Sequence, residues 1–200
     1  MAKVALGLAP HSGWAALVAL GGKRDAPAVL ARTRVEMADP GDFGAKAPYH
    51  AVEGLALAEA QQRLNRFEAS AERMAGSALR ALVGELRAKG HSVRTAGILE
   101  SSGRKVGSLS AILASHALIH TADGELYRDA LADAAAHCRL PLLRVREREA
   151  MARAVQVLKV PEPVLARRLG EMGRPFGPPW RQDEKLAALV AWLALAGAAD

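Results

Sequence analysis

The opening of the chain constrains the fold more than any other segment. Residues 3–22 comprise an apolar run, a short polar turn at residues 10–13 and a second apolar run that ends in two glycines. Two apolar runs joined by a turn of small and polar residues are typical of a β-hairpin. The turn of this hairpin is expected to carry His11 and Ser12 to the mouth of a sheet.

The rest of the chain alternates between strand and helix signals, which favours an α/β fold. Apolar residues recur with a helical period between His50 and Lys89, where a bend is expected near Gly76, and a second helical segment is expected to be interrupted at Asp123 and Gly124. The expected strands are 27–37, 93–99 and 140–145, and the expected helices are 50–89, 109–136, 147–159, 163–171 and one from residue 182. This order predicts a mixed five-stranded sheet, its first three strands antiparallel, flanked by helices.

Length and composition place the chain among ordinary globular proteins. Its 200 residues suit a single domain spanning 1–200, and 50% of them are hydrophobic. The lone cysteine, Cys138, excludes an internal disulfide framework and favours a cytoplasmic location. The polar turn at residues 10–13 argues against a signal peptide, and the apolar run 186–199 is shorter than the roughly 20 residues of a membrane-spanning helix.

The formal net charge of +6 is compatible with nucleic acid as a partner. Arg144, Arg146 and Arg148 alternate, so a strand would present all three on one face. That face is interpreted either as a solvated edge or as a stripe that binds phosphates.

A family resemblance rests on the hairpin and on two later segments. The sequence Gly7-Leu8-Ala9-Pro10-His11-Ser12 resembles the Gly-Ile-Asp-Pro-Gly-Ser turn of RuvC-type Holliday-junction resolvases, in the ribonuclease H-like superfamily. Residues 98–100 resemble the end of that family's fourth strand, and Asp183 with Glu184 lies where its last helix begins. The resemblance implies a ribonuclease H-like α/β fold and suggests Glu100 and Asp183 as catalytic, metal-binding carboxylates.

The resemblance also identifies a departure, because Ala9 stands where the family has a metal-binding Asp. Two-metal cleavage of phosphodiesters needs carboxylates that hold two ions roughly 4 Å apart. Ala9 cannot bridge two Mg²⁺ ions, so the nuclease site is either lost or rebuilt around His11. We expect His11, Glu100 and Asp183 to meet in one pocket, and any divalent metal to be Mn²⁺ or Zn²⁺ rather than Mg²⁺.

A second group of candidate metal ligands is the pair His116 and His120. Their spacing of four residues puts both rings on one face of a helix, an arrangement that suits a transition metal. The zinc-protease signature would require a Glu at Ala117, so the alternative is a pair that satisfies hydrogen bonds or caps a neighbouring helix.

Four residues are candidates for contact with nucleic acid. Ser12 lies in the hairpin turn, Arg104 and Lys105 follow the fourth strand in a Ser- and Gly-containing loop, and Trp180 precedes the last helix. Such a loop can bind a phosphate, and an indole can stack on a base. The alternatives are a flexible loop and a tryptophan that packs the start of a helix.

Three function classes follow from the sequence. The first is a nucleic-acid-associated protein with an altered or lost metal-dependent nuclease site; as an enzyme it would be a phosphodiester hydrolase. The second is a non-catalytic interaction module that forms a homodimer. The third is a small relative of the actin-like ATPases, which normally need a Gly-rich phosphate loop and two domains. Salt-dependent DNA binding separates the first class from the second.

Overall fold

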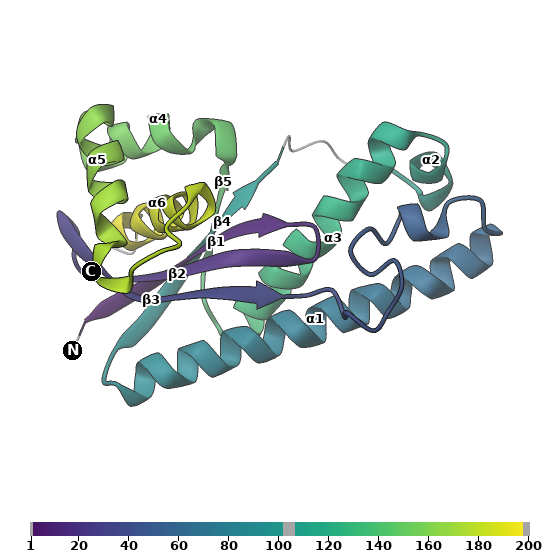
Figure 1. Cartoon of the computed structure of the whole chain (residues 1–200), viewed down its shortest axis with the longest axis horizontal. Coiled ribbons are helices and arrows are strands. Elements are labelled where there is room, and N and C mark those ends of the chain that lie inside the picture. Colours follow the sequence, from purple (N-terminus) through teal and green to yellow (C-terminus); the bar gives the residue numbers. More distant parts are fainter. Residues whose placement is uncertain (1, 102–106, 198–200) are drawn as a thin grey trace.

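The computed structural model describes residues 2–101 and 107–197. A five-stranded sheet with the order β3-β2-β1-β4-β5 forms its centre (Figure 1). The strands are β1 (Lys3–His11), β2 (Trp14–Lys23), β3 (Ala26–Glu36), β4 (Ser92–Glu100) and β5 (Leu142–Arg146). β1, β2 and β3 are antiparallel neighbours, whereas β4 runs parallel to β1 and to β5. The expected mixed sheet with three antiparallel strands is confirmed.

Two groups of helices cover the two faces of this sheet (Figure 1). The helices are α1 (Leu57–Ala88), α2 (Leu109–Leu113), α3 (His116–His137), α4 (Glu147–Leu158), α5 (Glu162–Met172) and α6 (Gln182–Gly197), with short 3-10 helices at His50–Val52 and Arg174–Phe176. α1 and α3 pack on one face, and α4, α5 and α6 pack on the other.

Two helix boundaries differ from the expectation. The interruption expected at Asp123 and Gly124 is wrong, because α3 is continuous there and the chain breaks instead between α2 and α3. A glycine inside a helix costs only about 1 kcal/mol relative to alanine, and the packing of α3 against α1 outweighs that cost. The long helix begins at Leu57 rather than at His50, and it continues without a break through Gly76.

The pleat of β1 divides its side chains between the two cores. Leu6 and Leu8 pack against α1 and α3, whereas Ala9 packs with the residues of α6. Successive residues of a strand point to opposite faces, so the odd-numbered positions of β1 face α6. His11, the last residue of β1, has the same parity as Ala9. The family position occupied by Ala9 therefore lies on the α6 side of the sheet.

Two glycines in the central strands allow α6 to approach the sheet closely. A Cβ atom on Gly7 would lie 1.9 Å from the carbonyl oxygen of Ala187, and one on Gly97 would lie 2.6 Å from that of Val190. Neither distance is compatible with a side chain, so both positions need glycine as long as α6 keeps its place. The close contact fixes the start of α6 against the end of β1.

The three alternating arginines do not share a strand face. β5 ends at Arg146, and Arg148 lies in the first turn of α4. Arg144 binds Glu100 at 3.2 Å, and Arg146 binds Glu149 at 3.4 Å. The single strand face expected for all three arginines is therefore wrong, because α4 begins before Arg148. Within residues 2–101 and 107–197, no helix is both long and apolar enough to cross a bilayer.

Candidate functional site

The ends of β1 and α6 bring together two of the residues expected to form a site. His11 closes β1, and Asp183 is the second residue of α6. Nε2 of His11 lies 3.0 Å from Oδ1 of Asp183, at hydrogen-bond distance. Both side chains are partly open to solvent, with 42% of the His11 side chain and 33% of the Asp183 side chain exposed. An acid at the start of α6 is also favoured by the helix dipole.

Glu100 has a different hydrogen-bond partner, so the expected pocket of His11, Glu100 and Asp183 stays a prediction. The Glu100 carboxylate accepts a hydrogen bond from Arg144 at 3.2 Å. Ile98 is paired with Arg144 across β4 and β5, and Glu100 has the same strand parity as Ile98. The pleat therefore directs the Glu100 side chain towards Arg144 rather than towards His11. Glu100 borders a separate cavity of about 520 Å³ between α4 and α6.

The family's two-metal arrangement is not reproduced at this edge of the sheet. Ala9 is apolar and only 4% exposed. The acids near this edge already have donors: Asp183 accepts from His11, Glu100 from Arg144 and Glu184 from the backbone N–H of Arg181. Mg²⁺ binds through hard oxygen ligands in a strict geometry, which this set of side chains does not offer. The residues present do not fit a pair of Mg²⁺ ions.

Asp183 also borders a cavity of about 440 Å³ at the β2–β3 side of α6, with basic and aromatic side chains around it. The Trp14 ring stacks on the His11 ring, with centroids 4.4 Å apart, and the guanidinium carbon of Arg34 lies 3.7 Å from the centroid of Trp14. Arg181 lines the same cavity from the segment before α6. We name Trp14, Arg34 and Arg181 the basic rim of this cavity.

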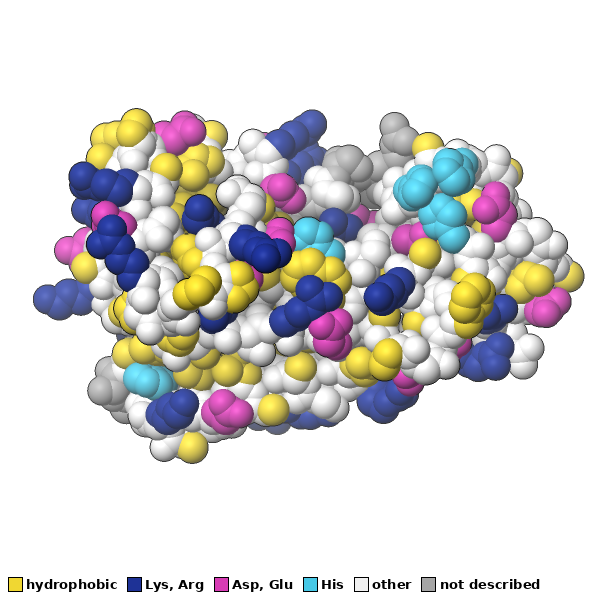
Figure 2. Space-filling view, viewed as in Figure 1, with side chains coloured by type: hydrophobic (Ala, Val, Ile, Leu, Met, Phe, Trp, Pro, Cys, Tyr) yellow, Lys and Arg dark blue, Asp and Glu magenta, His cyan; other side chains and the backbone are white. Residues whose placement is uncertain are grey.

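The basic rim was not found by sequence reasoning, because its members come from three separate segments. One signal was available: in a hairpin with a two-residue turn, Trp14 must pair with His11, as the structure has it. The approach of Arg34 and Arg181 depends on how β3 and α6 pack, which no local pattern reports. Figure 2 shows Lys and Arg side chains spread over this face of the molecule.

The residues expected to contact nucleic acid have different surroundings. Ser12 is exposed in the turn between β1 and β2. The indole N–H of Trp180 donates to the carbonyl of Leu169 at 2.7 Å, and its ring lies against Gly173. Trp180 thus packs against the end of α5, the alternative reading, and is not presented for stacking. Arg104 and Lys105 lie outside the described residues.

His116 and His120 are brought together at the other end of the molecule. Their Nε2 atoms are 3.1 Å apart, and the ring of His50 lies 4.5 Å from that of His120 between centroids. In the described part of the chain this is the one group of three potential metal ligands whose ligand atoms all lie within 4.8 Å of one another. Figure 2 shows the histidine side chains gathered over the start of α3, near α2. His50 was expected to belong to a helix start, not to this group.

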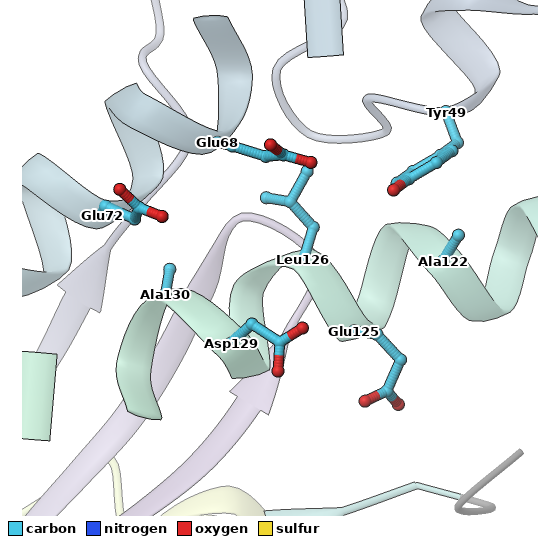
Figure 3. Close-up of a pocket in the computed structure, with 8 residues that line it drawn as sticks. All are labelled: Tyr49, Glu68, Glu72, Ala122, Glu125, Leu126, Asp129 and Ala130. Atoms are coloured by element: carbon cyan, nitrogen blue, oxygen red, sulfur yellow. The ribbon is translucent and has the colours of Figure 1, made fainter. Parts of the chain in front are cut away.

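An acidic cavity of about 290 Å³ lies between α1 and α3 (Figure 3). Glu68 and Glu72 reach it from α1, and Glu125 and Asp129 from α3. Burial, followed by the charges of Glu72 and Asp129, raises the pKa of Glu68 above its ordinary value.

The pKa values of two further groups in the acidic cavity, Asp129 and Tyr49, are also raised. Burial and the charge of Glu125 raise the pKa of Asp129, although Arg144 and Arg128 oppose the shift. Burial raises the pKa of Tyr49 to about 12. A concentration of carboxylates repels phosphate groups, so nucleic acid is disfavoured on this side of the molecule.

Comparison with solved structures identifies the fold. The chain is similar to RuvC of T. thermophilus in complex with a Holliday junction substrate, with a TM-score of 0.57 and 13% sequence identity over 98% of this chain and 94% of that one. A second Thermus thermophilus RuvC structure aligns with a TM-score of 0.55 and 12% identity, over 98% of this chain and 95% of that one. The expected ribonuclease H-like fold is confirmed. No protein-family model and no curated protein sequence matches the chain.

Proposed function

We propose that this ribonuclease H-like protein binds nucleic acid and that its ordinary Mg²⁺-dependent nuclease site is altered or lost. The observation that carries the proposal is the pairing of an end-to-end RuvC-like fold with Ala9 at the first-strand metal position. The similar RuvC structure holds a Holliday junction, which supports branched DNA as the first substrate class to examine.

The basic rim supports nucleic acid as the partner. Arg34 and Arg181 line this cavity and are exposed, and exposed arginines attract phosphates. Arg34 is also paired with Glu36, which a phosphate would have to displace or share. Arg32 holds the neighbouring loop in place by donating to the carbonyl oxygen of Gly177 at 3.0 Å. The acidic cavity lies between α1 and α3 and has four carboxylates in its lining, whereas the cavity of the basic rim combines three arginines with Asp183 and Glu184.

The altered site is proposed to consist of His11 and Asp183, with Glu100 at its border. Asp183 accepts from His11 and Glu100 accepts from Arg144, so each carboxylate already has a hydrogen-bond donor without a metal. Any divalent ion at this edge would be Mn²⁺ or Zn²⁺ rather than Mg²⁺, because an imidazole is a better ligand for transition metals. Ser12, in the hairpin turn, remains a candidate for phosphate contact, and Arg104 and Lys105 remain candidates from the sequence alone.

The proposal is tested by binding and cleavage measured on the same preparation. Fluorescence anisotropy with a four-way junction, duplex DNA, single-stranded DNA and RNA should give affinities that fall steeply as salt rises. Cleavage assays with Mg²⁺, Mn²⁺ and Zn²⁺, beside a Glu100→Gln variant, should give no Mg²⁺-supported product above background.

Two outcomes would contradict the proposal. Robust Mg²⁺-dependent cleavage that Glu100→Gln abolishes would mean that another acid replaces the missing first-strand Asp. Salt-independent or undetectable binding to every nucleic acid would instead favour the interaction module, which light scattering tests by asking whether the chain forms a homodimer.

A further inference from the structure

The histidine group at the start of α3 is separate from the edge of the sheet where the RuvC-like chemistry is expected. Its members are His116 and His120 on α3 and His50 on the short 3-10 helix before α1. None of them lines the cavity that carries the basic rim. What this group does is therefore a question apart from the proposed function.

Helix geometry places two of the rings and their neighbouring acid on one side of α3. His116, His120 and Asp123 are separated by four and three residues, spacings that keep side chains on a common helix face. Asp123 is only 4% exposed, and it is one of the few buried charged groups among the described residues. A buried carboxylate needs hydrogen-bond donors, and its donors here come from the segment before α1.

Asp123 orients His50. Its Oδ1 accepts the backbone N–H of Tyr49 at 2.7 Å, and its Oδ2 lies 2.5 Å from Nδ1 of His50. With Nδ1 bound to the carboxylate, Nε2 is the ring nitrogen left to coordinate an ion. A histidine whose second nitrogen is held by a carboxylate is the usual arrangement around protein-bound metals, because the carboxylate fixes the tautomer and makes the ring a stronger ligand.

One distance within the group matches a pair of ligands on a single ion, and the third ring lies close to that pair. Zn²⁺ bonds to histidine nitrogen at about 2.0–2.1 Å, so two nitrogens in a tetrahedral site lie roughly 3.3 Å apart. The Nε2 atoms of His116 and His120 are 3.1 Å apart, a distance that suits two ligands of one ion and also a hydrogen bond between the rings. The three rings meet edge to face, at interplanar angles of 61° to 89°, and one ligand nitrogen of each lies within 4.8 Å of the other two.

We propose that His50, His116 and His120 bind one transition-metal ion, Zn²⁺ in the first instance, with Asp123 as the residue that positions His50. His116 and His120 are exposed, so the fourth coordination position is open to water or another small ligand. The ion also links α3 to the segment before α1. That segment is already held to α3 by the hydroxyl of Tyr127, which donates to the carbonyl of Ala45.

Titration of the metal-free full chain with Zn²⁺ tests the proposal. Isothermal titration calorimetry should give one ion per chain, and His50→Ala or His120→Ala should each weaken binding by more than about tenfold. His137→Ala is the matched control, because His137 lies on the same helix but bonds to the carbonyl of Asp133. The affinity of the His137→Ala variant for Zn²⁺ should equal that of the unaltered chain.

Two further measurements separate a lost ligand from a lost fold. Circular dichroism of each metal-free variant must match the unaltered chain, and zinc should raise the melting temperature of the unaltered chain but not of His120→Ala. Replacement by Co²⁺ should give a visible absorption band that azide shifts if the fourth position is open. Absence of zinc binding, or equal binding by His120→Ala, would overturn the site, and a spectrum indifferent to azide would overturn the open position.

Discussion

The edge of the sheet and the start of α3 both combine histidine with aspartate, yet they arrange the pair in opposite ways. At the edge, His11 is bound directly by Asp183, and the nearby Glu100 is bound by Arg144. At the start of α3, Asp123 is buried behind His50, which leaves the outer nitrogens of three rings to converge. The aspartate occupies the exposed nitrogen of its histidine in the first region, whereas it holds the inner nitrogen and leaves the outer one open in the second.

This difference shows that the residue types at a site say less about metal binding than the directions in which their side chains point. Glu100 at the end of β4 and Asp183 at the start of α6 look like metal ligands in the sequence, but each accepts a hydrogen bond from a neighbouring side chain. A buried aspartate inside a helix looks structural, but it determines which nitrogen of a neighbouring histidine is available. We therefore expect the histidine group at the start of α3 to bind a metal ion, whereas the edge of the sheet does not fit a pair of Mg²⁺ ions.

The largest expected effect comes from moving α6 away from the edge. In Gly7→Ala the new Cβ would lie 1.9 Å from the carbonyl oxygen of Ala187, so α6 must shift and separate Asp183 from His11. We expect the free energy of unfolding to fall by about 3 kcal/mol, at the upper end of the usual cost of overpacking a core. Urea denaturation measures the change.

Gly84→Ala is the control for the glycine substitution. Nothing lies within 4 Å of a Cβ built at Gly84, an exposed position inside α1. This change should leave stability unaltered or raise it by up to about 1 kcal/mol, because alanine is the better helix former. A Gly7→Ala variant as stable as the Gly84→Ala variant would mean that α6 is not tightly held.

Asp123→Asn should weaken zinc binding at the start of α3, although His50, His116 and His120 are all retained. The amide NH2 that replaces one carboxylate oxygen donates a hydrogen bond, so it can contact Nδ1 of His50 only when that nitrogen carries no proton. The ring proton then sits on Nε2, the nitrogen proposed to bind the ion. Zinc affinity should fall about 10- to 100-fold, the usual effect of removing an orienting partner. Competition with a chromogenic chelator measures the affinity, and junction binding at the sheet edge should not change.

Arg181→Ala tests whether the basic rim contacts the phosphates of a bound nucleic acid. Loss of one phosphate contact should weaken junction binding a few-fold and reduce the slope of log K against log salt by about 1. Arg66→Ala on the exposed side of α1 is the matched control, since it removes the same charge on the opposite face of the sheet. Equal slopes for both variants would show that net charge alone drives binding.

The smallest effect concerns the acidic cavity. The pKa of Glu68 is raised in the folded protein, so its contribution to stability is present at low pH and is lost as the pH rises through the folded-state pKa. Glu68→Gln should therefore raise the stability at pH 7 by about 0.3 kcal/mol, the scale of a like-charge pair with Glu72 one turn away. The gain should vanish below the unfolded-state pKa near 4, as thermal melts across pH would record.

Glu85→Gln on the same helix serves as the comparison for this last change. Glu85 is exposed and is not among the residues that line the acidic cavity. If both glutamine variants respond to pH in the same way, crowding of carboxylates in the cavity is not the cause.

The architecture was largely predictable from local patterns. The apolar runs around Gly13 predict the hairpin, and the helical period after residue 57 predicts α1, because both signals arise from neighbours in the chain. The motif from Gly7 to Ser12 was enough to indicate the fold that comparison then identified. Helix continuity at Gly124 was not predictable in this way, since it depends on the packing of α3 against α1.

The sequence by itself determined the strand and helix order, the absence of a first-strand carboxylate at Ala9 and the common face of His116 and His120. Only the tertiary structure decided that Glu100 meets Arg144, that Arg34 covers Trp14, and that His50 joins the α3 pair through Asp123. The physical reason is the separation along the chain between the residues that interact. Periodicity and turn chemistry act between residues a few positions apart, whereas these contacts depend on strand parity and on which helix face is buried.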